Sequence, residues 1–203
     1  MMTVRLRTSA RNMETKKEIR SRLKKQRSLM SADECRSMSH EIYKRLTALE
    51  LDRDYDNILL YSAIRNEVNT DEYFACLINK AKKIYYPRVC GDEMSFYRVR
   101  SLDELNCGSF NINEPDMTDE YTQADGRALM IVPGLGFSDT GYRIGYGKGF
   151  YDRYLSSFTK RDTVTAVGVG YDFQLLGNVT FEDEYDVPLD GVITDKREVF
   201  IDD

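Results

Sequence analysis

A glycine-rich segment in the second half of the chain carries the side chains with the clearest capacity for chemistry. Gly145, Gly147 and Gly149 alternate there, and glycine lets the backbone approach a phosphate closely and present its amides. Arg143 and Lys148 lie in the same segment and supply a guanidinium fork and a mobile ammonium for phosphate oxygens. The pattern predicts a phosphate-binding loop. A glycine-rich surface connection without a ligand is the alternative.

The spacing excludes the two best-known glycine motifs. A P-loop aligned on Lys148 requires glycine at 142 and serine or threonine at 149, but the chain has Tyr142 and Gly149. The dinucleotide-binding pattern requires glycine at 150, where the chain has Phe150. The loop is therefore expected to bind phosphate in another geometry.

Two aspartates near this loop are candidates for binding a metal ion. Asp152 follows the glycines directly, and Asp190 precedes a predicted strand. Proteins usually hold Mg²⁺ through one or two carboxylates together with substrate phosphates, so two converging aspartates would suit that ion. Considered alone, an aspartate at the position of Asp190 is more often the cap of a helix or turn than a metal ligand.

Histidine and cysteine usage excludes several kinds of site. The single histidine, His40, falls in a helical stretch far from any nucleophile motif, which removes most catalytic triads. The four cysteines form no C-x-x-C pair, so a structural zinc site is not expected; they are Cys35, Cys76, Cys90 and Cys107. They are expected to be reduced thiols. Acid–base chemistry is left to carboxylates, tyrosines, lysines or bound groups.

Composition and charge indicate a soluble, cytoplasmic protein that binds a small anion. The chain has 203 residues, a net charge of −5 and 41% hydrophobic residues, which fits one domain and argues against nucleic-acid binding. No apolar run approaches the roughly 18 residues that span a bilayer. Seven of the twelve residues from Lys16 to Arg27 are basic, which favours a local anionic ligand. Residues 1–12 are interpreted as an extension and 13–203 as the domain; a monomer or weak dimer is expected.

The sequence pattern predicts the elements that must position these residues. Residues 14–28 and 31–49 are expected to form a helical hairpin, the second helix opening with a capping box at Ser31 and Glu34. Predicted strands then alternate with helices at 70–82 and 149–158. The strands are 57–62, 83–87, 94–99, 128–132, 164–169 and 192–193. This order indicates an α/β fold of the three-layer, Rossmann-like kind, with a mainly parallel central sheet flanked by helices. The glycine-rich loop follows strand 128–132, where ligands bind in such folds.

With these motifs in order, the chain resembles the 5-formyltetrahydrofolate cyclo-ligase family. The resemblance runs from about Lys16 to Thr194, and its most specific part is Gly141-x-Arg-x-Gly-x-Gly-Lys-Gly-Phe-Tyr-Asp152. The segments that also match are Lys16 with Arg20, 66–70, Pro87, 133–137 and 186–190 with Thr194. The chain departs from the family pattern at Asn66, where an acid is common, and at Tyr185, where histidine is common.

The resemblance implies an ATP-dependent and Mg²⁺-dependent reaction. Members close 5-formyltetrahydrofolate to 5,10-methenyltetrahydrofolate and release ADP and phosphate. ATP would phosphorylate the formyl oxygen, and N10 would attack the activated carbon before phosphate leaves. Because phosphoryl transfer depends mainly on positioning and charge neutralisation, such a site needs no histidine.

The resemblance also implies roles for individual residues. Lys148, Arg143 and Tyr151 are the catalytic candidates, and Asp152 and Asp190 the metal ligands. The reduced folate is assigned to Glu67, Ser62, Tyr61 and Tyr151. ATP is assigned to Lys16, Arg20, Arg143, Ile144, Gly145, Tyr146, Gly147, Lys148, Gly149, Phe150 and Tyr151.

Several of these residues also have a purely structural explanation. Glu67 is also explained as a helix cap, and Lys16 with Arg20 as a solvated basic face. Phe137, Tyr142 and Phe150 are further candidates for stacking on a pterin, although aromatic residues are as often part of a core. Two other functions remain open: an ATP-dependent enzyme for another folate-like substrate, and a non-catalytic nucleotide- or folate-binding regulator.

Overall fold

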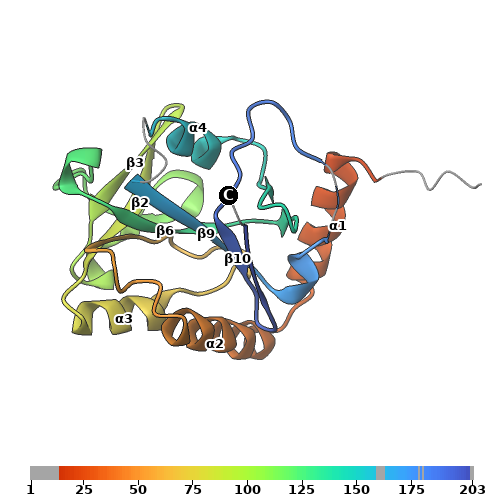
Figure 1. Cartoon of the computed structure of the whole chain (residues 1–203), viewed down its shortest axis with the longest axis horizontal. Helices are drawn as coiled ribbons and strands as arrows, with labels where there is room; N and C mark the ends of the chain where they lie inside the picture. The colour runs from red at the N-terminus through yellow and green to blue at the C-terminus, as the bar shows by residue number, and fades with distance from the viewer. Residues whose placement is uncertain (1–13, 159–162, 178, 180, 202–203) are drawn as a thin grey trace, which may run out of the picture.

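A seven-stranded sheet forms the centre of the molecule (Figure 1). The computed structural model describes residues 14–158, 163–177, 179 and 181–201, and for residue 110 the backbone alone. The proposed extension, residues 1–12, lies outside these ranges. The strand order is β11-β10-β9-β6-β1-β2-β3. The strands of this sheet are β1 (Asn57–Leu59), β2 (Lys83–Cys90), β3 (Glu93–Arg98), β6 (Ala128–Pro133), β9 (Val164–Val169), β10 (Gly191–Ile193) and β11 (Glu198–Phe200).

All neighbouring strands run parallel except at the two edges, where β3 and β11 are antiparallel to β2 and β10. The prediction of a mainly parallel sheet is therefore confirmed. The edge strands return through tight hairpins, which only antiparallel neighbours allow.

Helices cover both faces of the sheet. Helices α2 (Ala32–Ala48) and α3 (Asp71–Asn79) lie on one face, and α4 (Phe150–Ser156) lies on the other (Figure 1). Strand β6 shows why: Leu129 and Ile131 join the core under α2, while Met130 and Val132 join the core under α4. Because successive side chains of a strand point to opposite faces, a fully apolar strand must be buried on both sides. The three-layer arrangement follows.

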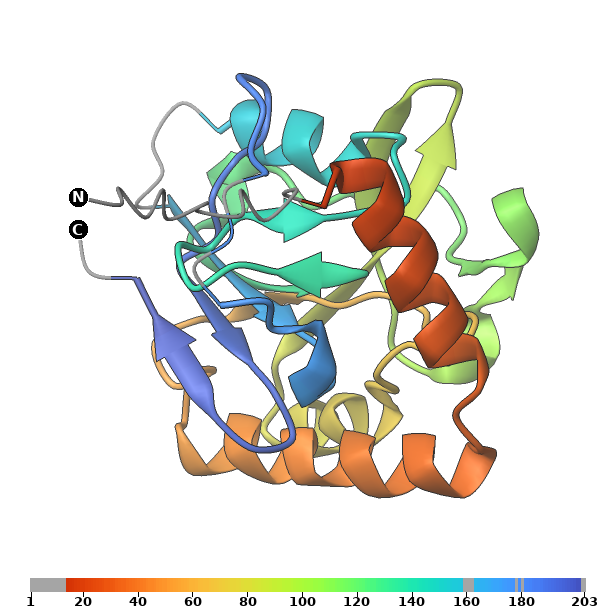
Figure 2. The same ribbon diagram turned by 90° about the vertical axis from the view of Figure 1, so that its right-hand side faces the viewer.

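The two N-terminal helices begin as predicted but do not lie side by side. Helix α1 (Lys16–Ser28) and α2 both open with capping boxes, at Thr15 with Glu18 and at Ser31 with Glu34. Helix α1 packs on β7 (Gly136–Phe137), whereas α2 packs on α3 and β10. Figure 2 shows α1 rising steeply away from α2. The predicted helical hairpin is wrong because the two apolar faces bury against different parts of the chain.

Several predicted boundaries shift. Strand β2 continues past Pro87, which pairs with Phe96 of β3. Since Val99 donates to Ile84 in this ladder, alternation of the pairs leaves the missing N–H of Pro87 pointing away from β3. The C-terminal edge strand β11 and two small two-stranded sheets were not predicted. The remaining short elements are β4 (Asn106–Cys107), β5 (Asn113–Glu114), β8 (Arg143–Ile144) and the 3₁₀ turns at Leu102–Glu104, Ser109–Asn111, Gln123–Asp125 and Asp172–Gln174.

The helices place one constraint on membrane interaction. Across the part of the chain that the structure describes, none combines the length and the apolar character that crossing a bilayer requires.

Candidate functional site

A cavity of about 460 Å³ opens beyond the carboxyl ends of β1 and β6. Its volume falls within the usual range of small-molecule sites. Pro133 and Gly134 form its floor where β6 ends, and Tyr61 and Ser62 line it after β1. The glycine-rich loop and α1 form the opposite wall. Segments distant in sequence therefore meet at the edge of the sheet where the sequence predicted a ligand.

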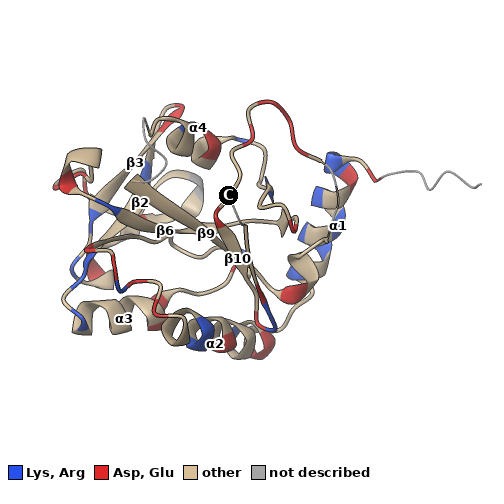
Figure 3. Cartoon of the chain, in the orientation of Figure 1, with Lys and Arg blue, Asp and Glu red and all other residues tan. Residues whose placement is uncertain are grey.

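One wall of the cavity is a row of cations from α1. Lys16, Arg20 and Lys24 line it at intervals of four residues, the spacing that places side chains on one face of a helix. Figure 3 shows this basic stripe along α1. Arg20 donates from Nε to the carbonyl of Gly145 at 3.0 Å. Lys24 was not singled out from the sequence, although its spacing from Arg20 was the available signal.

Lys16 faces two acids from the late acidic segment. Its Nζ lies 2.9 Å from Oδ2 of Asp183 and 2.5 Å from Oδ2 of Asp186. Burial lowers the pKa of Lys16, but hydrogen bonds to Asp186 and Asp183 outweigh this and raise it. The two acids line the cavity with Lys16. The rim therefore contains a charge pair that an incoming polyanion would have to rearrange.

The glycine-rich loop brings a buried arginine beneath the cavity. Arg143 is 8% exposed and donates from Nη2 to Oδ2 of Asp152 at 2.9 Å. Its guanidinium also lies over the ring of Tyr151, 5.2 Å from the centroid. A Cβ at residue 145 would lie 2.6 Å from Nη1 of Arg143. Glycine at 145 is therefore what leaves room for this guanidinium.

The outer part of the loop is exposed and is held by a neighbouring arginine. Gly147 and Gly149 have φ values of +98° and +68°, a region that other residues rarely adopt. Lys148 between them is exposed and lines the cavity. Arg153 donates to the carbonyls of Lys148 and Asp92, both at 2.8 Å, and so ties the loop to the β2–β3 hairpin.

Not every residue assigned to the nucleotide or the pterin reaches the cavity. Ile144 is fully buried and packs with α1. Phe137 is also fully buried, and its ring packs against Gly134, Gly168 and Gly170. Tyr142 packs against the same α1 cluster. Phe150 and Tyr151 do line the cavity. Two of the four aromatic candidates are thus in position to contact a flat ligand.

The acid Glu67 lies at the inner end of the cavity. It is 8% exposed, and its Oε2 accepts from the Ile64 amide at 3.1 Å while its Oε1 accepts from the Tyr146 hydroxyl at 3.1 Å. Burial raises the pKa of Glu67, and the charge of Arg27 opposes that rise. Thr70 occupies the cap of α3, and Glu67 makes none of its capping contacts. The turn to Glu67 includes Arg65 and Asn66 in left-handed conformations.

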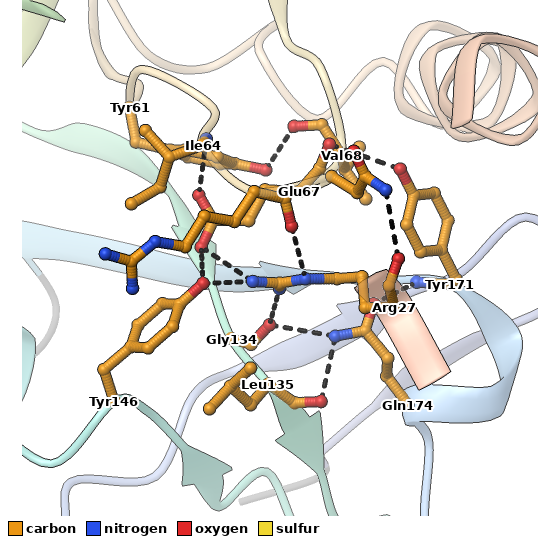
Figure 4. Close-up of polar contacts among 12 residues, drawn as sticks. Arg27, Tyr61, Ile64, Glu67, Val68, Gly134, Leu135, Tyr146, Tyr171 and Gln174 are labelled. Atoms are coloured by element: carbon orange, nitrogen blue, oxygen red, sulfur yellow. Dashed lines mark hydrogen bonds and ion pairs between the residues drawn. The ribbon is translucent and has the colours of Figure 1, made fainter. Parts of the chain in front are cut away.

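Arg27 is the main residue that sequence reasoning missed (Figure 4). It is 2% exposed, and its Nη2 lies 3.6 Å from Oε1 of Glu67 and donates to the Tyr146 hydroxyl. Nε donates to the carbonyl of Arg65 at 3.0 Å, and Nη1 donates to that of Gly134 at 3.1 Å. The signal was its position on the α1 face that carries Lys16, Arg20 and Lys24.

The remaining wall is apolar and comes largely from the β2–β3 hairpin. The apolar side chains that line it are Ile64, Pro87, Val89, Met94 and Ile112. Tyr61 and Ser62, both predicted, lie beside this wall. The Tyr61 hydroxyl donates to the Val68 carbonyl at 2.7 Å, and the Ser62 hydroxyl donates to the Asn113 carbonyl at 2.5 Å. The cavity thus has a cationic side and an apolar side, with Glu67 at the inner end.

Of the two predicted metal ligands, only Asp152 lines the cavity. Asp190 accepts from the Ala166 amide through Oδ2 at 2.6 Å and donates from its own amide to the Ala166 carbonyl at 2.8 Å. Asp190 precedes β10, and a residue before a parallel strand lies toward the edge opposite the ligand site. These contacts join Asp190 to strand β9, so its side chain does not cap a turn as the alternative proposed.

Comparison with known proteins gives a consistent result. A family model described as "5-formyltetrahydrofolate cyclo-ligase family" matches residues 12–195. The 5-formyltetrahydrofolate cyclo-ligase of Mycoplasma pneumoniae is 30% identical, covering 89% of this chain and 99% of that protein. The enzyme of that name from Mus musculus is 27% identical, covering 88% and 92%.

Solved structures show the same similarity. The 5,10-methenyltetrahydrofolate synthetase of Aquifex aeolicus superposes with a TM-score of 0.80 at 33% identity, covering 93% of each chain. The synthetase from Mycoplasma pneumoniae superposes with a TM-score of 0.72 at 27% identity, covering 89% of this chain and 98% of that one. The similarity therefore extends over sequence and three-dimensional structure alike.

Proposed function

Because the chain belongs to the 5-formyltetrahydrofolate cyclo-ligase family, we propose that it converts 5-formyltetrahydrofolate to 5,10-methenyltetrahydrofolate while consuming ATP in the presence of Mg²⁺. The chain is an enzyme of the cyclo-ligase type, the name carried by its relatives from worm, mouse and mycoplasma. The observation that carries the full reaction is the two-sided cavity: one wall suits a polyphosphate, and the other suits a flat ring with polar edges.

The cationic side accounts for the nucleotide. Lys16, Arg20 and Lys24 line the cavity from α1, beside the loop at 145–149, whose Gly145 carbonyl accepts from Arg20. Lysine and arginine side chains, together with loop amides made accessible by glycine, are the usual ligands of phosphate. Lys148 also lines the cavity and would contact the transferred phosphoryl group, where an ammonium neutralises charge that develops in the transition state.

The apolar side accounts for the reduced folate. Tyr61, Pro87 and Tyr151 provide surfaces for the pterin ring, and Glu67 at the inner end provides a carboxylate for the donor edge of that ring. Since Tyr146 belongs to the loop and hydrogen-bonds Glu67, the two substrates would lie against a shared set of residues. That proximity is what transfer of a phosphoryl group between them requires.

The carboxylates of the cavity suit a magnesium ion bound mainly through phosphate. Proteins usually hold Mg²⁺ through one or two carboxylates plus substrate oxygens. Asp152 lines the cavity and is retained as a candidate; Asp186, which also lines it, replaces Asp190 as the second. The ion, when bound, would neutralise phosphate charge.

The protein's part in the reaction is positioning. Transfer to the formyl oxygen would make that oxygen a leaving group, N10 would attack the formyl carbon, and departing phosphate would complete the ring. Arg143 sits beneath the loop beside Asp152 and Tyr151, where it would orient the loop against the phosphates. The apolar wall would exclude water from the activated intermediate.

The direct test mixes purified protein, Mg-ATP and 5-formyltetrahydrofolate and follows methenyl absorbance together with ADP. We expect both products in equal amounts. ATP turnover with no methenyl product would instead indicate another folate-like substrate. Binding of both ligands without turnover would indicate a regulator, and either result would reject the proposal.

A further inference from the structure

The buried C-terminal end of α1 carries Arg27, whose guanidinium lies beside the carboxylate of Glu67. We propose that Arg27 is a positioning residue: its guanidinium holds the Glu67 carboxylate in one orientation and in its ionised form, and thereby sets the lower pH limit of the reaction. This inference rests on the proposed function, because it takes Glu67 as the acid that contacts the reduced folate.

The first observation is a directed chain of hydrogen bonds (Figure 4). Arg27 donates from Nη2 to the Tyr146 hydroxyl, and that hydroxyl donates to Oε1 of Glu67 at 3.1 Å. A guanidinium has only donors, so the phenol must accept from Arg27 and direct its own proton at Glu67. The direct separation of Arg27 Nη2 and Glu67 Oε1, 3.6 Å, is too long for a hydrogen bond but short for opposite charges.

The second observation is that Arg27 also holds the turn that carries Glu67. Its Nε donates to the carbonyl of Arg65, a residue with φ of +50°. The Asn66 amide donates in return to the carbonyls of Arg27 and Met30, at 3.1 Å and 3.0 Å. Left-handed conformations at non-glycine residues persist only where the surroundings enforce them. The end of α1 therefore fixes both the charge partner and the backbone of Glu67.

The third observation concerns charge. Burial by itself favours the neutral form of a carboxyl group and raises the pKa of Glu67, while the charge of Arg27 is the largest effect opposing it. The other titratable or charged groups that face Glu67 come from several elements. They are Arg65 on its own turn, Tyr146 from the loop, Tyr61 after β1, Tyr151 on α4 and Tyr171 after β9. Burial also raises the pKa of Tyr146, to about 12, so this phenol remains a donor at neutral pH.

Gln174 provides a matched control. Like Arg27 it is 2% exposed, and its amide donates to the same Gly134 carbonyl, at 2.9 Å. It also donates to the carbonyl of Leu135 and accepts from the Tyr171 amide, and its described hydrogen bonds do not include the side chains of Glu67 or Tyr146. Replacing Gln174 therefore disturbs the same floor of the cavity without removing a charge from Glu67.

The test compares Arg27→Gln, Arg27→Lys and Gln174→Met with the parent by ¹³C NMR titration of the Glu67 carboxyl and by the pH profile of kcat/KM. We expect Arg27→Gln to raise both the pH midpoint of the Glu67 titration and the acid limb of the kcat/KM profile by about one pH unit or more. At pH values below the limb, kcat/KM should therefore fall by about tenfold. Activity should recover as the pH is raised. Arg27→Lys should keep the limb near that of the parent but raise KM for the folate, because one ammonium cannot reach all four partners.

Unchanged titration of Glu67 in Arg27→Gln, or an equal shift in Gln174→Met, would overturn the inference. If Arg27→Gln does not fold, Arg27→Lys decides: a parent-like KM together with a shifted limb contradicts the assigned role. The NMR titration needs no turnover, so a parent without methenyl product would reject the proposed function while leaving the charge coupling testable.

Discussion

The two ends of α1 use the same kind of charge in opposite ways. At the outer end Lys16 lies at the cavity rim and pairs with two acids, Asp186 at 15% exposure and Asp183 at 69% exposure. The pair with Asp183 is the solvent-exposed one. At the inner end Arg27 is 2% exposed, and its guanidinium contacts the Arg65 and Gly134 carbonyls, the half-buried Tyr146 hydroxyl and the buried Glu67. Solvent-exposed ion pairs contribute little and exchange readily, whereas removing one partner of a buried pair is strongly destabilising. The rim is therefore suited to exchanging partners with phosphate, and the buried end to holding one geometry.

The largest expected effect lies on the exposed side. Lys148→Ala should lower kcat by about 10²–10³, the scale for losing one donor to developing charge, while the thermal unfolding midpoint stays near that of the parent. Steady-state kinetics and a thermal melt measure both. Lys17→Ala is the matched control, since this exposed α1 lysine does not line the cavity. Near-normal turnover in Lys148→Ala would remove that residue from the reacting phosphate.

The next largest effect should distinguish Asp152 from Asp190 by the Mg²⁺ requirement of their variants. Asp152→Asn should raise the Mg²⁺ concentration for half-maximal activity by about tenfold or more, because a neutral amide is a weaker ligand for a hard cation. Asp190→Asn should leave that concentration unchanged, since its amide oxygen can still accept from the Ala166 amide. Magnesium titrations of initial rate measure the difference. A raised requirement in Asp190→Asn would restore the original assignment of that residue as a ligand.

A smaller effect would come from the one side chain that joins the two sides. Tyr146→Phe removes the hydroxyl between Arg27 and Glu67, and we expect the coupling between nucleotide and folate binding to fall by roughly 1 kcal/mol. Calorimetric titration of a non-hydrolysable nucleotide, with and without folate, measures this coupling. Identical coupling in the parent and the variant would mean that the loop and Glu67 act independently.

The smallest effect should come from the rim acids. The pKa of Asp183 is lowered by its hydrogen bond to Lys16, but the exposed position makes the pair weak. Asp183→Asn should change nucleotide affinity by no more than about twofold. Equilibrium binding in low and high salt provides the measurement. A large loss of affinity would show that the rim is as rigid as the buried end and would break the comparison.

The fold was predictable because its signals are local and strong. The apolar run of β6 and the capping box at Ser31 each specify an element without reference to the rest of the chain. The relation between the first two helices was not predictable, since it depends on which distant surface buries Ile19 and Leu23. The width of the buried face of α3 was not predictable either: Tyr73, Phe74 and Leu77 are buried, whereas Ile78 beside them is 38% exposed.

The site was predictable in its residue types more than in its connections. Glu67, Lys148 and Asp152 reach the cavity as expected. Arg27 did not stand out, because a buried arginine and a solvated one look alike in sequence; only the contacts with Gly134 and Glu67 distinguish them. Asp190 does not line the cavity, and proximity to a strand does not by itself reveal which end of the strand faces the ligand.

The contact between Lys16 and Asp186 joins residues that are 170 positions apart. During synthesis the basic face of α1 emerges early, and its acidic counterpart emerges 170 residues later. The cavity is therefore completed only after residue 186 has left the ribosome, and until then Lys16 lacks the acids that it faces in the folded protein. Nascent chains stalled at this stage would expose the basic face of α1 without Asp183 and Asp186, and crosslinking to anionic surfaces would detect it.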